Sequence, residues 1–328
     1  MDNIKAIFVD SEGTLRDSNK KISSGTKEIL SLLKENKIQV ILTTGLPRFI
    51  SRKIAQEANA SNYLISSNGA DIYDQKNNLI IENLIIENKI VENIYELSHK
   101  KYNIILGVGD YEFSNNTNEY NMFARKIENI KSFSNMPILQ IHISQKQTSD
   151  EIFELCNEYY ENINLDILEY FKNNLDKFIF LRLKTNNYKI ENMNKNEIKA
   201  ILRSMRFFEL KKLKETILKY YDKKIHVGNE SIDFDKVSLN GETPWFSLNN
   251  IDAGKGIAIK KMCKYLNINI NNTIGIGNDY NDLSMINAVG TFVCPNTSRD
   301  FIKSECIDVY NNNNKGLEKI LRKVYEKR

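Results

Sequence analysis

A short apolar run near the start of the chain, Ala6 to Val9, stops abruptly at Asp10 and is followed by Gly13. A continuous run of β-branched and aromatic residues is typical of a parallel strand that is buried on both faces. Asp10 would then stand at the carboxyl end of that strand, beside a glycine-containing turn. Ligands of open α/β sheets bind just outside the carboxyl ends of the strands, so Asp10 is a candidate site residue. For this stretch alone, an Asp that caps a following helix is the alternative.

Two further strand candidates follow, at Ile38 to Leu42 and at Tyr63 to Ile65. An amphipathic helix that begins near Ser23 precedes the first of them, and a helix opened by Pro47 separates the two. Both strands end in small polar residues, Thr43-Thr44-Gly45 and Ser66-Ser67-Asn68-Gly69. This alternation predicts an α/β fold with a doubly wound, Rossmann-like parallel-sheet core.

The alternation is interrupted after a predicted hairpin, in which Ala70 to Tyr73 and Leu79 to Ile81 flank a polar turn. The segment that follows has a mixed α+β pattern, with strands predicted at 104–108, 138–143, 178–183, 225–227 and 232–237 and helices at 150–160 and 196–221. The α/β pattern resumes after Trp245, with a helix at 255–266 and a buried strand at 273–276. We therefore expect a core domain formed by residues 1–83 and 246–328, and an inserted α+β cap domain at 84–245.

Composition narrows the classes of protein that this chain can belong to. Of the 328 residues, 46 are basic and 42 are acidic, and their interleaving leaves no basic stripe for nucleic acid. The four cysteines are far apart and form no CxxC pair, which indicates reduced thiols. No signal-peptide start and no apolar run of membrane-spanning length are present, so we expect a cytoplasmic protein without a membrane partner.

Four short motifs stand at predicted strand or helix ends: Asp10-Ser11-Glu12-Gly13-Thr14, Thr44-Gly45, Lys255-Gly256 and Gly277-Asn278-Asp279-Tyr280-Asn281-Asp282. In this order they resemble the motifs of the haloacid dehalogenase-like (HAD) hydrolase superfamily. More narrowly, the chain resembles the Cof-type (subclass IIB) phosphatase branch, whose cap domain lies between the second and third motifs. Asn68-Gly69-Ala70, and Asn296 after a final strand, match that branch as well.

The resemblance implies a phosphatase that hydrolyses small phosphorylated metabolites, sugar phosphates first among them, through an aspartyl-phosphate. Asp10 would be the nucleophile, and Glu12 would protonate the leaving oxygen and then activate water. Thr44 and Lys255 would complete the catalytic set by holding the phosphoryl oxygens. The phosphate- or substrate-binding residues implied in this way are Thr44, Gly45, Asn68, Lys255 and Asn281.

The resemblance also implies Mg²⁺ as cofactor, held by Asp10, by the backbone carbonyl of Glu12 and by the last motif. Asn278 stands where the family has an anionic ligand, so weaker metal binding is expected unless Asp279 or Asp282 compensates. Asp282 is also a candidate to orient Lys255 or metal-bound water. Glu12 stands where the family phosphatases have an Asp. Its side chain is one methylene longer, so it must adopt a different conformation to bring the carboxylate to the same place.

Two alternatives stay open beside the phosphatase. The departures at Glu12 and Asn278 are compatible with a catalytically weakened HAD protein that binds a phosphometabolite in a regulatory role. A phosphomutase is the other alternative, since related caps serve both chemistries. Leu46 replaces an Arg that is common after Thr-Gly in the family, and the role of the nearby Arg48 is open. The sequence names neither the substrate nor the oligomeric state.

Overall fold

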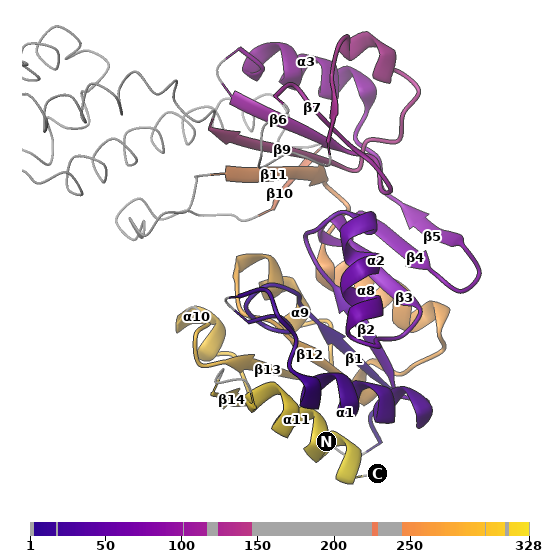
Figure 1. Ribbon diagram of the computed structural model, residues 1–328, viewed down its shortest axis with the longest axis vertical. Helices are drawn as coiled ribbons and strands as arrows, with labels where there is room; N and C mark the ends of the chain where they lie inside the picture. The colour runs from indigo at the N-terminus through magenta and orange to yellow at the C-terminus, as the bar shows by residue number, and fades with distance from the viewer. Residues whose placement is uncertain are drawn as a thin grey trace, which may run out of the picture.

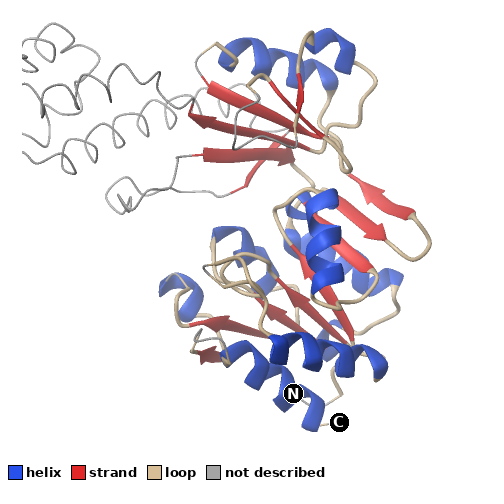
Figure 2. Ribbon diagram, viewed as in Figure 1, coloured by secondary structure: helices blue, strands red, loops and turns tan. Residues whose placement is uncertain are grey.

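The computed structural model describes residues 3–17, 19–100, 102–116, 124–145, 225–228, 245–298, 300–311 and 315–327. Two sheets lie one above the other in Figure 1, and Figure 2 shows the helices that pack on them. No helix in this part of the chain is long and apolar enough to cross a membrane.

The larger sheet has the strand order β14-β13-β12-β1-β2-β3-β4-β5. Its strands are β1 (Ala6–Val9), β2 (Gln39–Thr43), β3 (Tyr63–Ser66), β4 (Asp71–Asp74), β5 (Leu79–Asn83), β12 (Thr273–Ile276), β13 (Thr291–Pro295) and β14 (Asp308–Tyr310). The strands from β14 to β3 pair in parallel, whereas β3, β4 and β5 pair antiparallel. The predicted hairpin is therefore formed by β4 and β5.

Helices cover both faces of this sheet: α1 (Ser24–Glu35), α2 (Arg48–Glu57), α8 (Lys255–Tyr265), α9 (Leu283–Ile286), α10 (Asp300–Lys303) and α11 (Gly316–Glu326). Alternate residues of β1 face opposite sides of the sheet. Ile7 and Val9 share a core with α1, α2 and α11, whereas Ala6 and Phe8 share one with α8 and α9. Burial on both faces explains why β1 is continuously apolar, and the predicted α/β fold class is confirmed.

Local sequence signals place the first helix. Ser23 is its N-cap, and the Ser23 hydroxyl accepts a hydrogen bond of 3.1 Å from the backbone N–H of Thr26. Ile29, Leu30 and Leu33 form the buried stripe that packs on the sheet. The expected N-cap and apolar face are both present, so α1 lies where the sequence predicts it.

The second sheet has the strand order β10-β11-β9-β6-β7-β8. Its strands are β6 (Tyr102–Gly107), β7 (Glu112–Ser114), β8 (Arg125–Lys126), β9 (Gln140–Gln145), β10 (Ile225–Gly228) and β11 (Trp245–Asn250). Helix α3 (Asn88–Ser98) covers one face, where Ile94 packs in a common core with Ile104 and Ile141 (Figure 1). The sequence did not predict α3, because its N-cap position holds Glu87, a residue type that does not signal the start of a helix.

The predicted boundary between residues 245 and 246 falls inside β11 and needs correction. Leu248 pairs with Ile141 of β9 and is buried in the core of the second sheet. This sheet therefore extends through Asn250, and the chain returns to the larger sheet only after it. The elements predicted at 150–160, 178–183, 196–221 and 232–237 lie outside the described residues.

Candidate active site

Three of the sequence motifs meet at the carboxyl edge of the larger sheet. Strand β1 lies between β2 and β12, so the residues that follow these strands are neighbours. The backbone N–H of Asp10 donates to the carbonyl of Ile276 at 2.8 Å, and the N–H of Thr44 donates to the carbonyl of Ile65 at 2.9 Å. The sheet thus continues to position Asp10 and Thr44 beyond the ends of their strands.

The fourth motif supplies a buried lysine to this edge. Lys255 is the first residue of α8 and is 1% exposed. Its Nζ donates to Oδ1 of Asp10 at 2.6 Å and to Oδ1 of Asp282 at 2.7 Å. Burial by itself would lower the pKa of Lys255, but the two carboxylates outweigh burial and raise it. The ammonium is therefore a fixed positive charge beside Asp10.

Asp10 is itself buried at 6% exposure. Burial raises the pKa of its carboxyl to about 7, although the charge of Lys255 acts in the opposite direction. The neighbouring carboxylate of Asp282 adds to the increase. A perturbed carboxyl paired with a buried lysine at a strand end is the arrangement expected of a functional site.

Both carboxylate oxygens of Asp282 are engaged. Oδ1 accepts from Lys255, and Oδ2 accepts the backbone N–H groups of Asn278 at 2.8 Å and Asp279 at 3.1 Å. These contacts favour the orienting role that the sequence left open for Asp282 over direct metal ligation. Among the residues that the structure describes, no group of three or more His, Cys, Asp or Glu side chains is arranged to hold a metal ion.

Asn278 packs against the turn that follows Asp10. Its Oδ1 accepts the hydroxyl proton of Thr14 at 2.8 Å. Gly13 has φ +73°, and a Cβ at this position would stand 2.8 Å from Nδ2 of Asn278. Gly13 is therefore needed both for the turn and for the close approach of the two loops. Asp10 and the Asn278 amide, both predicted metal ligands, lie on neighbouring loops.

A second cluster forms beside Thr44. A Cβ on Gly45 would stand 2.8 Å from Oδ1 of Asn68 and 3.5 Å from Nδ2 of Asn281. Nδ2 of Asn281 donates to Oδ1 of Asn68 at 3.1 Å, and Asn68 has a left-handed backbone with φ 54°. The hydroxyl of Thr44 accepts the N–H of Leu46 at 3.2 Å, a bond in which its own proton takes no part. The predicted phosphate-binding residues other than Lys255 therefore form one group.

Glu12 differs from the other predicted catalytic residues in its surroundings. Its side chain is 45% exposed, and Oε1 accepts a hydrogen bond of 2.8 Å from Nη1 of Arg16. The structure therefore places the Glu12 carboxylate in an exposed ion pair, whereas Asp10 and Lys255 are buried.

Two further polar residues with buried contacts, Asn249 and Arg48, were not predicted as site residues. Asn249, in β11, donates through Nδ2 to the carbonyls of Ser67 and Leu139, each at 3.0 Å. These partners are 182 and 110 residues away along the chain, so no local pattern signals the contact. Arg48, whose role was open, donates to the buried carboxylate of Asp71 through Nε at 2.9 Å and Nη2 at 2.5 Å.

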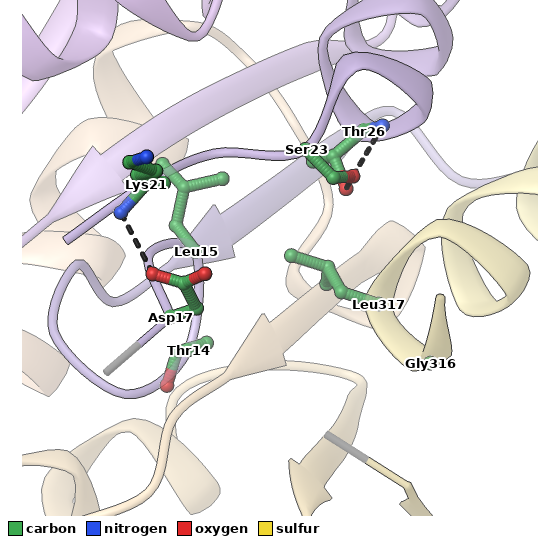
Figure 3. A pocket seen from close by; sticks show the side chains of 8 residues that line it. All are labelled: Thr14, Leu15, Asp17, Lys21, Ser23, Thr26, Gly316 and Leu317. Atoms are coloured by element: carbon green, nitrogen blue, oxygen red, sulfur yellow. Dashed lines mark hydrogen bonds between the residues drawn. The ribbon is translucent and has the colours of Figure 1, made fainter. Parts of the chain in front are cut away.

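A separate pocket lies between the loop that follows Thr14 and the helices α1 and α11 (Figure 3). Asp17 in its wall accepts the backbone N–H of Lys21 at 2.8 Å, and Ser23 bonds to Thr26. None of the predicted site residues lines this pocket. Its polar groups stabilise the turn and the helix N-terminus, and the candidate site remains the group around Asp10.

A doubly wound sheet that presents a buried carboxylate and a buried lysine at its carboxyl edge defines an α/β protein with a candidate active site around Asp10. The family model for haloacid dehalogenase-like hydrolases matches residues 7–201 and 159–321. The chain belongs to the haloacid dehalogenase-like hydrolase family. The family prediction, with its Cof-type branch, and the prediction of a hydrolase are confirmed.

Named proteins resemble the chain over nearly its whole length. A Buchnera aphidicola protein named "Putative phosphatase BU028/BU029" is 26% identical over 98% of this chain and 96% of its own. Phosphatase YwpJ of Bacillus subtilis is 23% identical over 92% of each chain. A solved structure of a HAD subclass IIB sugar phosphatase superposes with a TM-score of 0.64 at 14% identity, covering 97% of this chain and 98% of its own.

Proposed function

We propose that this protein is a magnesium-dependent phosphatase that hydrolyses small phosphorylated metabolites through an aspartyl-phosphate on Asp10. The observation that carries the proposal is the 2.6 Å contact between the Asp10 carboxylate and the buried ammonium of Lys255 at the end of the central strand. Relatives named as phosphatases support the reaction class. The sugar phosphatase with the same fold makes sugar phosphates the leading substrate class. The free thiols of Cys263, Cys294 and Cys306 favour the cytoplasm as its place of action.

In the first step, a carboxylate oxygen of Asp10 attacks phosphorus, and the bond between phosphorus and the ester oxygen breaks. Negative charge that develops on the phosphoryl oxygens would be stabilised by the ammonium of Lys255 and by the hydroxyl proton of Thr44. Asp282 keeps Lys255 in position through its 2.7 Å hydrogen bond. The leaving oxygen must gain a proton, because an alkoxide is a poor leaving group.

Glu12 is the proposed source of that proton. In the second step the resulting Glu12 carboxylate would accept a proton from water, whose oxygen attacks phosphorus and breaks its bond to Asp10. Inorganic phosphate leaves, and both carboxyl groups return to their starting states. Because Glu12 is paired with Arg16 at an exposed turn, this role requires its side chain to rotate away from that partner.

The residues around Asp10 fit a magnesium ion by the chemistry of their donors. The Asp10 carboxylate, the backbone carbonyl of Glu12 and the amide oxygen of Asn278 are oxygen ligands of the kind that Mg²⁺ prefers. Thr14 occupies only one of the two lone pairs of the Asn278 oxygen. When bound, the cation would offset the repulsion between a carboxylate nucleophile and a phosphate ester. Asp279 is a further candidate ligand at the same loop.

The second sheet and the segment inserted with it form the proposed cap domain, which would exclude water from the site and select the substrate. We take this domain to extend over residues 84–250, because β11 pairs within the second sheet. Its contact with the larger sheet through Asn249 supports a position beside the phosphate-binding residues.

The exposed ion pair of Glu12 with Arg16 favours one competing function, a weakened HAD protein that binds a phosphometabolite without turning it over. A panel of sugar phosphates, nucleotides and an aryl phosphate, assayed for released phosphate with Mg²⁺, separates the candidates. The phosphatase predicts turnover that EDTA abolishes and added Mg²⁺ restores. Binding without turnover would support the competing function, and phosphoryl transfer between hydroxyls of one substrate would identify a phosphomutase.

A further inference from the structure

Three asparagine side chains form a continuous chain of hydrogen bonds across the two sheets. Nδ2 of Asn281 donates to Oδ1 of Asn68 at 3.1 Å, and Nδ2 of Asn68 donates to Oδ1 of Asn249 at 3.3 Å. Asn281 follows β12 and Asn68 follows β3, whereas Asn249 belongs to β11 of the second sheet. Asn68 is 5% exposed and Asn249 is fully buried, so water has little access to the chain.

The contacts of Asn249, the last of the three asparagines, fix the orientation of all three side-chain amides. Nδ2 of Asn249 contacts the carbonyl oxygens of Ser67 and Leu139, and carbonyl oxygens only accept hydrogen bonds. The NH₂ group of Asn249 must therefore face them, which turns its oxygen toward Asn68. Asn68 must then present NH₂ to Asn249 and its oxygen to Asn281. The opposite orientation would leave two buried carbonyls facing an amide oxygen, an arrangement that is disfavoured.

This order leaves one donor on each of the two amides beside Gly45. Each NH₂ group carries two hydrogens, and the chain uses one on Asn68 and one on Asn281. Gly45 has no side chain, and the amide atoms that lie closest to the space left open are Oδ1 of Asn68 and Nδ2 of Asn281. The two remaining N–H groups are suited to the oxygen atoms of an anion such as a phosphoryl group.

We propose that Asn249 is a positioning residue that orients the amides of Asn68 and Asn281 for phosphate, and that this orientation requires the two sheets to be docked. One anchor of Asn249, the carbonyl of Ser67, follows β3 of the larger sheet, while the other, that of Leu139, directly precedes β9. Separation of the sheets would break one anchor and release Asn68. The inference rests on the proposed function and adds a residue that links the second sheet to the phosphate site.

The test is the affinity for inorganic phosphate, measured by calorimetry in the presence of Mg²⁺. Asn249→Ala should weaken phosphate binding by roughly tenfold, because two donors to an anion lose their alignment. The matched control is Asn250→Ala, which removes an exposed bond of 2.7 Å to the Ile85 carbonyl from the next residue of the same strand. Asn250→Ala should bind phosphate like the wild type. If Asn249→Ala does not fold, the same measurement is made on Asn249→Ser, which keeps one hydroxyl donor.

A double-mutant cycle distinguishes positioning from a general structural role. If Asn249 acts through Asn68, Asn249→Ala should cause no further loss in an Asn68→Ala background. The inference would be overturned if the losses of phosphate affinity in the two single variants were additive. It would also be overturned if Asn249→Ala and Asn250→Ala bound phosphate equally well. In either case the wild type would still hydrolyse phosphate esters, so the proposed function would stand. If the proposed function is wrong, the wild type itself would neither bind phosphate nor release it from any ester. That result would contradict the inference as well.

Discussion

Glu12 is the residue at which the chemistry of this chain departs most from that of its family. In the proposed mechanism it supplies the acid/base carboxylate, on a side chain one methylene longer than the family aspartate. Its partner Arg16 is four residues away, and the Glu12 side chain is 45% exposed, so the ion pair contributes at most about 1 kcal/mol. So weak a contact would allow Glu12 to rotate toward the leaving oxygen, as the proposed mechanism requires.

Replacing Glu12 tests this rotation. Glu12→Gln should slow the hydrolysis of alkyl phosphates by about 10²–10⁴-fold, because their leaving oxygen needs a proton. An aryl phosphate should lose less in the first step and should accumulate phosphorylated enzyme as a burst. Arg16→Met, which removes the ion-pair partner of Glu12 together with the bond from Nε of Arg16 to the carbonyl of Lys20, should not lower either rate. If the single-turnover rates of wild type and Glu12→Gln were equal for both esters, the Glu12 side chain would have no acid/base role. Position 12 would then contribute only its backbone carbonyl.

Glu112, in β7 of the second sheet, should make the stability of the folded protein depend on pH. Burial raises the pKa of its carboxyl to about 7 in the folded state, above the ordinary value of 4.5. The folded protein therefore binds a proton that the unfolded chain releases, and the associated stability is lost as the pH rises from 4.5 to 7.

Glu112→Gln removes this titration. The free energy of unfolding of the variant minus that of the wild type should increase between pH 5 and pH 8 by up to about 3 kcal/mol. Urea unfolding at both pH values, with the second sheet followed separately where the transitions resolve, provides the measurement. A difference that does not change with pH would show that Glu112 is solvated in the folded protein.

At the scale of elements, Arg48 joins α2 to β4. Its guanidinium contacts both carboxylate oxygens of Asp71, which is 0% exposed, and stacks 4.5 Å from the ring centroid of Tyr73. The hydroxyl of Ser66 donates to the same carboxylate at 2.5 Å. Removing one member of a buried ion pair leaves an uncompensated charge, and this cost exceeds the net gain of the pair.

Arg48→Met should therefore reduce the free energy of unfolding by about 3–5 kcal/mol. Lys27→Met is the matched control, because Lys27 pairs with Glu57 at 3.0 Å in an exposed contact that also reaches α2. The control should cost less than about 1 kcal/mol. Comparable losses in the two variants, measured by urea unfolding, would contradict the account of Arg48.

The strands that carry the site are predictable because their signals are local. β1, β2 and β12 are short apolar runs that end in polar residues, and the structure places all three side by side. β11 was missed, although Phe246 to Asn249 alternate in polarity, because its pairing partners in β9 lie about a hundred residues away along the chain. Asn249 was missed for the same reason, since its role follows only from the contact between the sheets.

At the scale of the whole molecule, two further contacts bring the sheets together. Asp110, in the turn between β6 and β7, accepts from Nη1 of Arg48 at 3.2 Å and from Nη1 of Arg52 at 3.3 Å. The core of each sheet is nevertheless formed by its own residues, with Ile7 and Ile104 in separate clusters. The sheets are thus distinct packing units, joined by polar contacts and by a small apolar cluster of Ala70, Leu139 and Ala253. Units joined in this way are expected to move relative to each other.

This organisation predicts that the larger sheet folds without the inserted segment. A variant that lacks residues 84–250, with Asn83 joined to Ile251 by a short linker, should unfold cooperatively and retain hydrolysis of a small aryl phosphate. It should bind phosphate more weakly than the wild type, because Asn249 is removed, and should discriminate poorly among esters. A variant that is unfolded by circular dichroism would show that the two sheets form one folding unit.

The central claim is that the phosphoryl group is transferred to Asp10. The direct measurement is to stop the reaction during a single turnover, reduce the acyl phosphate with borohydride and locate the modified residue by mass spectrometry. We expect the reduced side chain at position 10 in the wild type with Mg²⁺ and substrate, and neither modification nor phosphate release in Asp10→Asn. Phosphate release by Asp10→Asn, under conditions that exclude deamidation, or a modified residue elsewhere in the chain, would contradict the mechanism.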